Sequence, residues 1–271
     1  MTKYVELSIE ELHNELLIIL KEFKAICDKY NLEYMLYAGT LLGAIRHNGF
    51  IPWDDNVDVI MPREDFEKFK DIARNCLSDK FFLQTPETDP GYKHLNIPLK
   101  IRMNDTVYLE YEEDGTEEYN TGIYLNVYAF DNKPRGTVNY SLQKMYKYTL
   151  LREPKLAYEN RGFLKFKNLV YRLAHKFMKK VSISTRRNIE KFLRTRPAYR
   201  NIFWLGIDNS SSFSFMDSSV YPLGEIRFED DIFKCPGDTN KYLTALYGTY
   251  RVVPDDHESH KHVKAVYKKM T

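Results

Sequence analysis

Residues 56–76, NVDVIMPREDFEKFKDIARNC, run from an alternating apolar stretch directly into a helix pattern. The alternation over 56–61 predicts a strand, and Pro62 stands where its fixed φ favours the first turn of a helix. The apolar residues that follow recur at helical spacing: Phe66, Phe69, Ile72 and Cys76. When a strand leads straight into an amphipathic helix, the apolar faces of the strand and of the helix have to be buried against one core. This indicates an α/β or α+β fold.

The remaining segments also alternate between strand and helix patterns. A capping box formed by Ser8 and Glu11 opens an amphipathic helix that extends to about residue 30. Strand patterns lie in 33–39, 92–105, 106–114, 121–131 and 227–237, and helix patterns in 40–47, 138–200 and 240–248. This order predicts an α/β (α+β) fold, in which a mixed sheet core is joined by a helical subdomain.

The length of 271 residues allows one large domain or two modest ones, with enough chain to bury a core without disulfide bonds. We expect three parts. A catalytic core covers 1–135, a basic helical insertion or subdomain covers 136–205, and a C-terminal segment over 206–271 completes the core.

The three cysteines, Cys27, Cys76 and Cys235, are far apart and lack the spacing of metal ligands. We interpret them as reduced thiols, which favours a cytoplasmic setting. No apolar run approaches the roughly 18 residues that span a bilayer, and the N-terminus does not resemble a signal peptide. We therefore expect a cytoplasmic protein that is soluble or peripheral at the inner membrane face.

Basic charge is concentrated in one segment, although the net charge of the chain is only +2. Residues 163–200 hold twelve lysines and arginines against one acid, Glu190. The excess suggests a polyanionic neighbour such as an anionic membrane, a nucleic acid or a phosphate-bearing polymer. A helix packed on the core with a solvated basic face explains it equally well. Nucleic acid is not expected as a partner, because no recognised nucleic-acid motif accompanies the charge.

The acidic stretch before and within the strand predicted over 56–61 is the main site candidate. Asn56 and Asp58 share one face of the strand, and Asp54 lies two residues earlier. A glycine turn about 15 residues upstream, at Gly39 and Thr40, completes a pattern that recurs in Mg²⁺-phosphate sites. The carboxylates would hold one or two divalent ions that activate a hydroxyl and neutralise the phosphoryl group. A solvated acidic turn that caps a helix gives the same short pattern.

A longer string, YAGTLLGAIRHNGFIPWDDNVDVIMPREDFEKF over 37–69, resembles the LicD family of phosphocholine transferases. The family pattern is G-T-L-L-G-x-x-R-H-x-G-F-I-P-W-D-D-D-x-D-x-x-M-P-R-x-D-[FY]. The similarity continues in TGIYLNVYAFDNKP over 121–134 and in FEDDIFKCPGDTNKYLTALYGTY over 228–250. It spans most of the chain and is specific because the matched string is long.

The resemblance implies a nucleotidyltransferase-like fold for the core. It also implies a CDP-activated donor, usually CDP-choline or a related CDP-alcohol, and Mg²⁺ or Mn²⁺ as cofactor. The phospho-alcohol would be transferred to a sugar hydroxyl of a cell-surface glycan such as teichoic acid, lipopolysaccharide or capsule, and CMP would be released. A lipid-linked glycan acceptor would give the basic segment a membrane to contact.

Carried over residue by residue, the resemblance places Gly39 and Thr40 at the donor phosphates. Asp58 would be a metal ligand, supported by Asp54 or Asp55. Two metal positions of the family hold asparagine instead, Asn56 and Asn126.

Asparagine keeps one carbonyl oxygen but loses the charge on which Mg²⁺ sites depend. We therefore expect weak metal binding and slow or absent turnover. The chain is either a form inactivated by introduced substitutions or a natural member with altered or lost catalysis. If the asparagines are native, it could bind donor or glycan without chemistry.

Further candidates have both a functional and a structural interpretation. Arg46 and His47 could bind phosphate or belong to a surface turn. Lys100 and Arg102 alternate on one strand face and could neutralise a diphosphate or be solvated edge charges. His260, in the histidine-bearing tail DDHESHKH, could contact phosphate or be solvated.

An aromatic side chain could hold the quaternary ammonium of choline. Trp53 is the best single candidate for this contact, because it lies within the motif. Packing beside the acidic turn explains Trp53 at least as well.

Overall fold

The computed structural model describes residues 3–92, 97–111, 113, 115–150, 173, 176, 180–209, 211–252 and 263–270. Its elements follow one another as β1 (Tyr4–Glu6), α1 (Ile9–Tyr30), β2 (Met35–Leu36), α2 (Ala38–His47), β3 (Val57–Pro62), α3 (Arg63–Cys76), β4 (Phe81–Gln84), β5 (Leu99–Met103), β6 (Thr106–Glu110), β7 (Tyr124–Pro134), α4 (Thr137–Leu150), α6 (Ile183–Arg194), β8 (Ala198–Leu205), β9 (Ser214–Met216), α7 (Asp217–Val220), β10 (Gly224–Phe228), β11 (Asp231–Cys235), α8 (Thr239–Tyr247) and β12 (Val263–Lys269).

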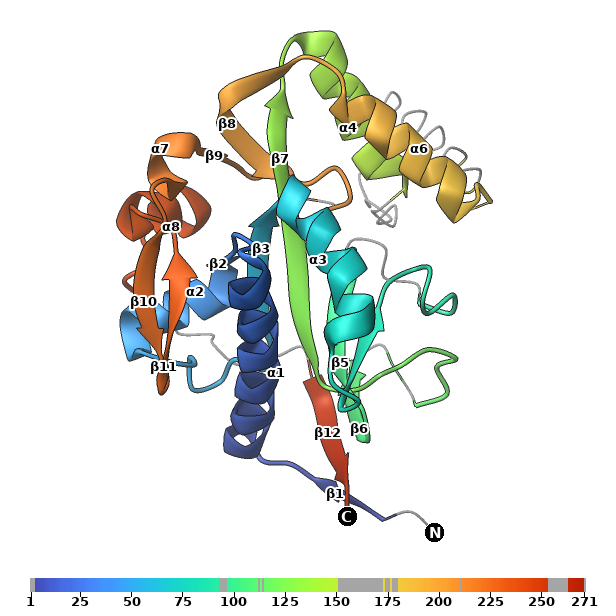
Figure 1. Ribbon diagram of the computed structural model, residues 1–271, viewed down its shortest axis with the longest axis vertical. Coiled ribbons are helices and arrows are strands. Elements are labelled where there is room, and N and C mark those ends of the chain that lie inside the picture. Colours follow the sequence, from blue (N-terminus) through green and yellow to red (C-terminus); the bar gives the residue numbers. More distant parts are fainter. Residues whose placement is uncertain are drawn as a thin grey trace, which may run out of the picture.

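A seven-stranded mixed sheet forms the centre of the molecule (Figure 1). Its path is β2-β3-β7-β5-β4, and β8 pairs with both β7 and β9. β3 and β7 run parallel, whereas the other pairings of this sheet are antiparallel. The mixed sheet with its helices confirms the predicted α/β (α+β) fold class.

Helices α1 and α3 lie side by side across one face of the sheet (Figure 1). The predicted capping box begins α1: the Glu11 backbone N–H donates to the Ser8 hydroxyl, and the Ser8 N–H donates to the Glu11 carboxylate. The apolar stripe of α1 packs on α3, with the rings of Phe23 and Phe69 4.8 Å apart. Burial of these stripes holds the two helices on the sheet.

Two smaller sheets complete the described part of the molecule. β12 lies between β1 and β6, so that the two ends of the described chain meet at one end of the molecule (Figure 1). The hairpin of β10 and β11 contacts α2 and β2 beside the main sheet. This places C-terminal residues next to the segment that carries the acidic motif.

Several predicted boundaries differ from the structure. The strand predicted over 33–39 is only Met35–Leu36, because α2 already begins at Ala38. The helical span predicted over 138–200 contains α4 and α6, but the chain becomes strand β8 at Ala198. Pro197 cannot continue a helix, and β8 gains a partner in β7. The division into three parts at 135 and 205 stays a prediction.

The basic segment is described only in part, from residue 180 onward and at residues 173 and 176. Within α6, Arg187 forms an ion pair with Glu87, and Arg194 lies 3.8 Å from Glu67. These two cations therefore face acids of the neighbouring core. None of the described helices is long and apolar enough to cross a membrane.

Arg63, the first residue of α3, joins three elements through a buried ion cluster. Its guanidinium donates to Asp131 of β7 at 2.9 Å and to Asp208, after β8, at 2.6 Å. Burial alone would raise the pKa of Asp208, but the Arg63 charge lowers it below its ordinary value. The cluster fixes the start of α3 against the ends of two strands.

We expect Arg63→Met to lower the free energy of unfolding by about 3 kcal/mol, because it leaves two buried carboxylates without their cation. Urea unfolding at neutral pH measures this loss. Arg135→Met, at an exposed arginine, serves as the control and should change stability by less than about 0.5 kcal/mol. As the pH falls below the ordinary Asp pKa of 3.8, the difference should shrink, because the unfolded chain takes up a proton that native Asp208 does not yet bind; the difference is lost once the pH falls below the lowered native pKa of Asp208. Equal losses in both variants would contradict the role of the cluster.

Candidate active site

The register of the central strands brings three polar side chains into one row. Asp58 of β3 lies opposite Asn126 of β7, and Asn126 lies opposite Lys100 of β5. The Asn126 amide nitrogen donates to the Asp58 carboxylate at 2.8 Å. The sequence separation between Asp58 and Asn126 is 68 residues, yet the parallel pairing makes them direct neighbours.

Lys100 and Arg102 turn away from solvent and bind other parts of the core. The Lys100 ammonium lies 3.6 Å from the centre of the Tyr124 ring and 3.3 Å from Glu110. Burial, together with the charge of Arg102, lowers the pKa of Lys100 to about 7. Arg102 donates to the side chain of Gln84 at 2.8 Å and to a backbone carbonyl. Neither side chain lines the cavity described below.

The start of α2 is fitted closely around the acidic segment. Any Cβ at Gly39 would lie 2.7 Å from Oδ2 of Asp54, so only glycine leaves this carboxylate in place. The Thr40 hydroxyl is buried and accepts a hydrogen bond from the backbone N–H of Asp58 at 2.8 Å. Ala38 adopts a positive φ of 47°, a conformation rare outside glycine. Thr40 thus positions β3, whereas Gly39 shapes the site itself.

A cavity of 440 Å³ opens beside this segment. Its lining combines one cation, two carboxylates, an amide and several aromatic rings: Arg46, Asp54, Asp58, Asn56, Trp53, Tyr128, Tyr247 and Tyr250, together with Gly39 and smaller side chains. One guanidinium nitrogen of Arg46 is buried and has no hydrogen-bond partner in the described part of the chain. Burying such a donor is costly unless a water molecule or a ligand accepts from it.

The other predicted residues lie around this cavity or outside it. Asp55 is fully buried and accepts a hydrogen bond from the backbone N–H of Val263, so it holds the start of β12 against the acidic segment. His47 is exposed and packs edge-on against Trp53, with ring centres 6.4 Å apart. Its partial burial, followed by the charge of Arg46, lowers the pKa of His47. His260 lies outside the described residues.

Four residues of the site were not predicted from the sequence. His13 of α1 contacts the Asp54 backbone carbonyl at 2.7 Å and stacks on Phe50. Tyr128, Tyr247 and Tyr250 line the cavity. Partial burial, followed by the charges of Asp58 and Asp54, raises the pKa of Tyr247 above its ordinary value. Tyr128 could have been found from the strand alternation, since it lies two residues after Asn126 on the same face.

The residues that the structure describes do not form a complete magnesium site. No group of three or more acidic, histidine or cysteine side chains among them could hold a metal ion. Two of the expected ligand positions are amides, and Asn126 directs an N–H toward the Asp58 oxygen that would bind the ion. The amide oxygen of Asn126 is buried without a hydrogen-bond partner in the described chain.

Comparison with known proteins finds similar chains. Residues 31–133, which contain the glycine turn, the acidic segment and Asn126, match the family described as LicD/FKTN/FKRP, nucleotidyltransferase domain. A lipopolysaccharide cholinephosphotransferase, LicD of Haemophilus influenzae, is 25 % identical over 97 % of this chain and 98 % of its own length. An uncharacterized protein of Rickettsia prowazekii is 24 % identical over 50 % of this chain and 57 % of its own.

The fit between Gly39 and Asp54 gives a test by double substitution. Gly39→Ala should lower the free energy of unfolding by about 1–3 kcal/mol, because the new methyl group overlaps the Asp54 carboxylate. In an Asp54→Ala background the same change should be neutral or stabilising by up to about 1 kcal/mol, since alanine favours the helix. Urea unfolding of the four proteins measures the coupling. Equal costs in both backgrounds would show that Asp54 does not require glycine at position 39.

Proposed function

The chain belongs to the LicD family, and from that premise we propose that it takes up CDP-choline and transfers phosphocholine to a sugar hydroxyl of a cell-surface glycan. The relative from Haemophilus influenzae, which aligns with nearly the whole chain, is named for cholinephosphotransfer to lipopolysaccharide. A related CDP-alcohol is the alternative donor. Mg²⁺ or Mn²⁺ dependence stays a prediction, because the described residues do not complete a metal site.

The composition of the 440 Å³ cavity is the observation that carries this proposal. Phosphocholine is zwitterionic, and the cavity offers surfaces for both of its charges. Trp53, Tyr247 and the Asp54 carboxylate are suited to a quaternary ammonium. The Arg46 nitrogen that has no partner among the described residues is suited to a phosphate oxygen. A donor that carries a polyol has no cation for the aromatic rings to bind.

In the proposed reaction the acceptor hydroxyl oxygen forms a bond to the phosphorus that carries choline. The bond from this phosphorus to the bridging oxygen of the donor breaks, and CMP leaves with that electron pair. The hydroxyl proton goes to a base, for which Asp54 and Asp58 are the carboxylates of the cavity. Arg46 balances the negative charge on the phosphoryl groups.

A second candidate function is donor or glycan binding without turnover. The hydrogen bond between Asn126 and Asp58 supports it, because the two side chains satisfy each other where the family places two carboxylates. With fewer carboxylates, the site has less charge to attract a divalent cation. The two functions share the donor cavity and differ only in the chemical step.

We expect Asn56→Asp with Asn126→Asp to raise CMP release from CDP-choline by at least about a hundredfold in the presence of Mg²⁺ and a lipopolysaccharide glycan, because the two carboxylates complete a metal site beside Asp58. The control adds the same charges at the exposed Asn188 and Asn201 and should leave the rate unchanged. Chromatography of CMP gives the measurement. If neither the native chain nor the reversion releases CMP from CDP-choline, CDP-glycerol or CDP-ribitol, the binding function is favoured.

Tyr247→Leu should weaken binding of CDP-choline about tenfold and leave CDP-glycerol unchanged, because only the choline ammonium uses the ring. Tyr199→Leu, at a tyrosine that is 38 % exposed and does not line the cavity, is the matched control. Calorimetric titration of both donors measures the difference. Equal losses for the two donors would contradict an aromatic contact with choline.

A further inference from the structure

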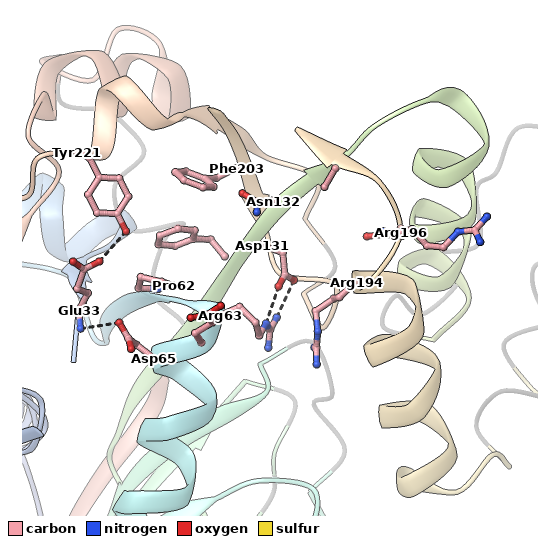
Figure 2. A pocket seen from close by; sticks show the side chains of 14 residues that line it. Glu33, Pro62, Arg63, Asp65, Asp131, Asn132, Arg194, Arg196, Phe203 and Tyr221 are labelled. Atoms are coloured by element: carbon pink, nitrogen blue, oxygen red, sulfur yellow. Dashed lines mark hydrogen bonds and ion pairs between the residues drawn. The ribbon is translucent and has the colours of Figure 1, made fainter. Parts of the chain in front are cut away.

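A second cavity, of 480 Å³, lies where β3 and β7 end and α3 begins (Figure 2). It shares no lining residue with the 440 Å³ cavity, although both are built on the same two strands. Asp58 lines the first and Pro62 the second, and these residues point to the same face of β3 because four positions separate them. At ~3.3 Å per residue the two positions are ~13 Å apart along the strand.

The wall of this second cavity contains an aromatic surface. The rings of Phe130 and Phe203 have centres 5.0 Å apart, and Phe203 lies 6.2 Å from Tyr221. Phe130 is buried. Phe203 and Tyr221, both labelled in Figure 2, are half-buried. The exposed Asn132 adds an amide at the mouth. The C–H faces of a sugar ring pack on such aromatic rings, and amides and carboxylates bind its hydroxyl groups.

Most charged side chains of the wall have contacts within the described chain. Arg194 lies 3.8 Å from Glu67, Arg196 donates to the side-chain oxygen of Asn139 at 3.2 Å, and Glu64 is exposed to solvent. Arg63 is satisfied by Asp131 and Asp208, as described above. Asp65 accepts from Lys68 at 3.0 Å and from the backbone N–H of Glu33.

The Glu33 carboxylate in turn accepts from the Tyr221 hydroxyl at 2.9 Å (Figure 2). An ionic ligand would have to compete with these contacts. Hydroxyl groups can donate to and accept from ion-paired groups without adding charge.

We propose that this second cavity is a subsite for an uncharged part of the acceptor glycan, remote from the hydroxyl that reacts. The inference rests on the proposed transfer to a glycan and adds a place where the acceptor is held. The ~13 Å between positions 58 and 62 along β3 corresponds to a few sugar units along an extended saccharide. Binding there would orient the acceptor without touching the reacting atoms.

The test measures binding of fluorescently labelled saccharides to the native chain by anisotropy. The probes are uncharged tetrasaccharides of glucose, galactose and N-acetylglucosamine, with sialylated and phosphorylated counterparts. Two variants alter the cavity: Phe203→Leu removes the ring, and Asn132→Ala removes an exposed amide without disturbing the core. Their matched controls on α6 are Phe192→Leu, at a side chain 59 % exposed, and Asn188→Ala. Calorimetric titration with CDP-choline accompanies every protein.

We expect the native chain to bind at least one uncharged tetrasaccharide and to bind its charged counterparts about tenfold more weakly. Phe203→Leu should weaken saccharide binding about tenfold and Asn132→Ala about fivefold, with no change in the controls or in CDP-choline affinity. The inference is overturned if no uncharged probe binds, if charged probes bind as tightly, or if both variants match their controls. If the native chain does not bind CDP-choline, the proposed donor is refuted instead. Failure of the proposed donor and failure of the acceptor subsite can therefore be told apart.

Discussion

The parallel pairing of β3 with β7 is the constraint on which the rest of the structure depends. Parallel neighbours cannot be joined by a tight turn, so the chain between them forms α3, β4, β5 and β6 before it returns. The register places Asp58 opposite Asn126 at one end and Pro62 opposite Phe130 at the other. A shift of one residue would turn Asp58 into the apolar layer beneath α1 and α3. The 440 Å³ cavity and the ion cluster of Arg63 therefore both depend on this register.

Local sequence patterns predicted the helices and strands well, but they could not predict contacts between residues far apart in the sequence. The capping box, the helix to residue 30 and the strand-to-helix passage at Pro62 depend on neighbouring residues, and the structure contains all three. The partners of Lys100 are set by tertiary packing against Tyr124 and Glu110, which no spacing reveals. Tyr247 and Tyr250 reach the 440 Å³ cavity only because the C-terminal part folds back beside α2. The motif predicts a site beside β3, whereas the aromatic lining of the cavity there could be found only from the fold.

The two asparagines change the electrostatics of the site in a specific way. Two carboxylates at positions 58 and 126, side by side in a buried row, would repel each other unless a cation lay between them. An amide at position 126 replaces that repulsion with a hydrogen bond of 2.8 Å. The strand pair is thus stable without metal, and the site loses the charge that would recruit one. Stability of the apo site and affinity for a divalent cation oppose each other at this position.

The same two strands also explain how a donor and an acceptor can be held by one rigid body. Asp58 and Tyr128 face the donor cavity, and Pro62 and Phe130 face the second cavity. Because the strands are paired on both sides within the sheet, the distance between the cavities is fixed by backbone hydrogen bonds rather than by a flexible loop. An acceptor bound at the second cavity would then present its reactive hydroxyl at a set distance from the phosphorus. If the second cavity holds the acceptor as proposed, this geometry would select the acceptor by its length as well as by the chemistry of the reacting sugar.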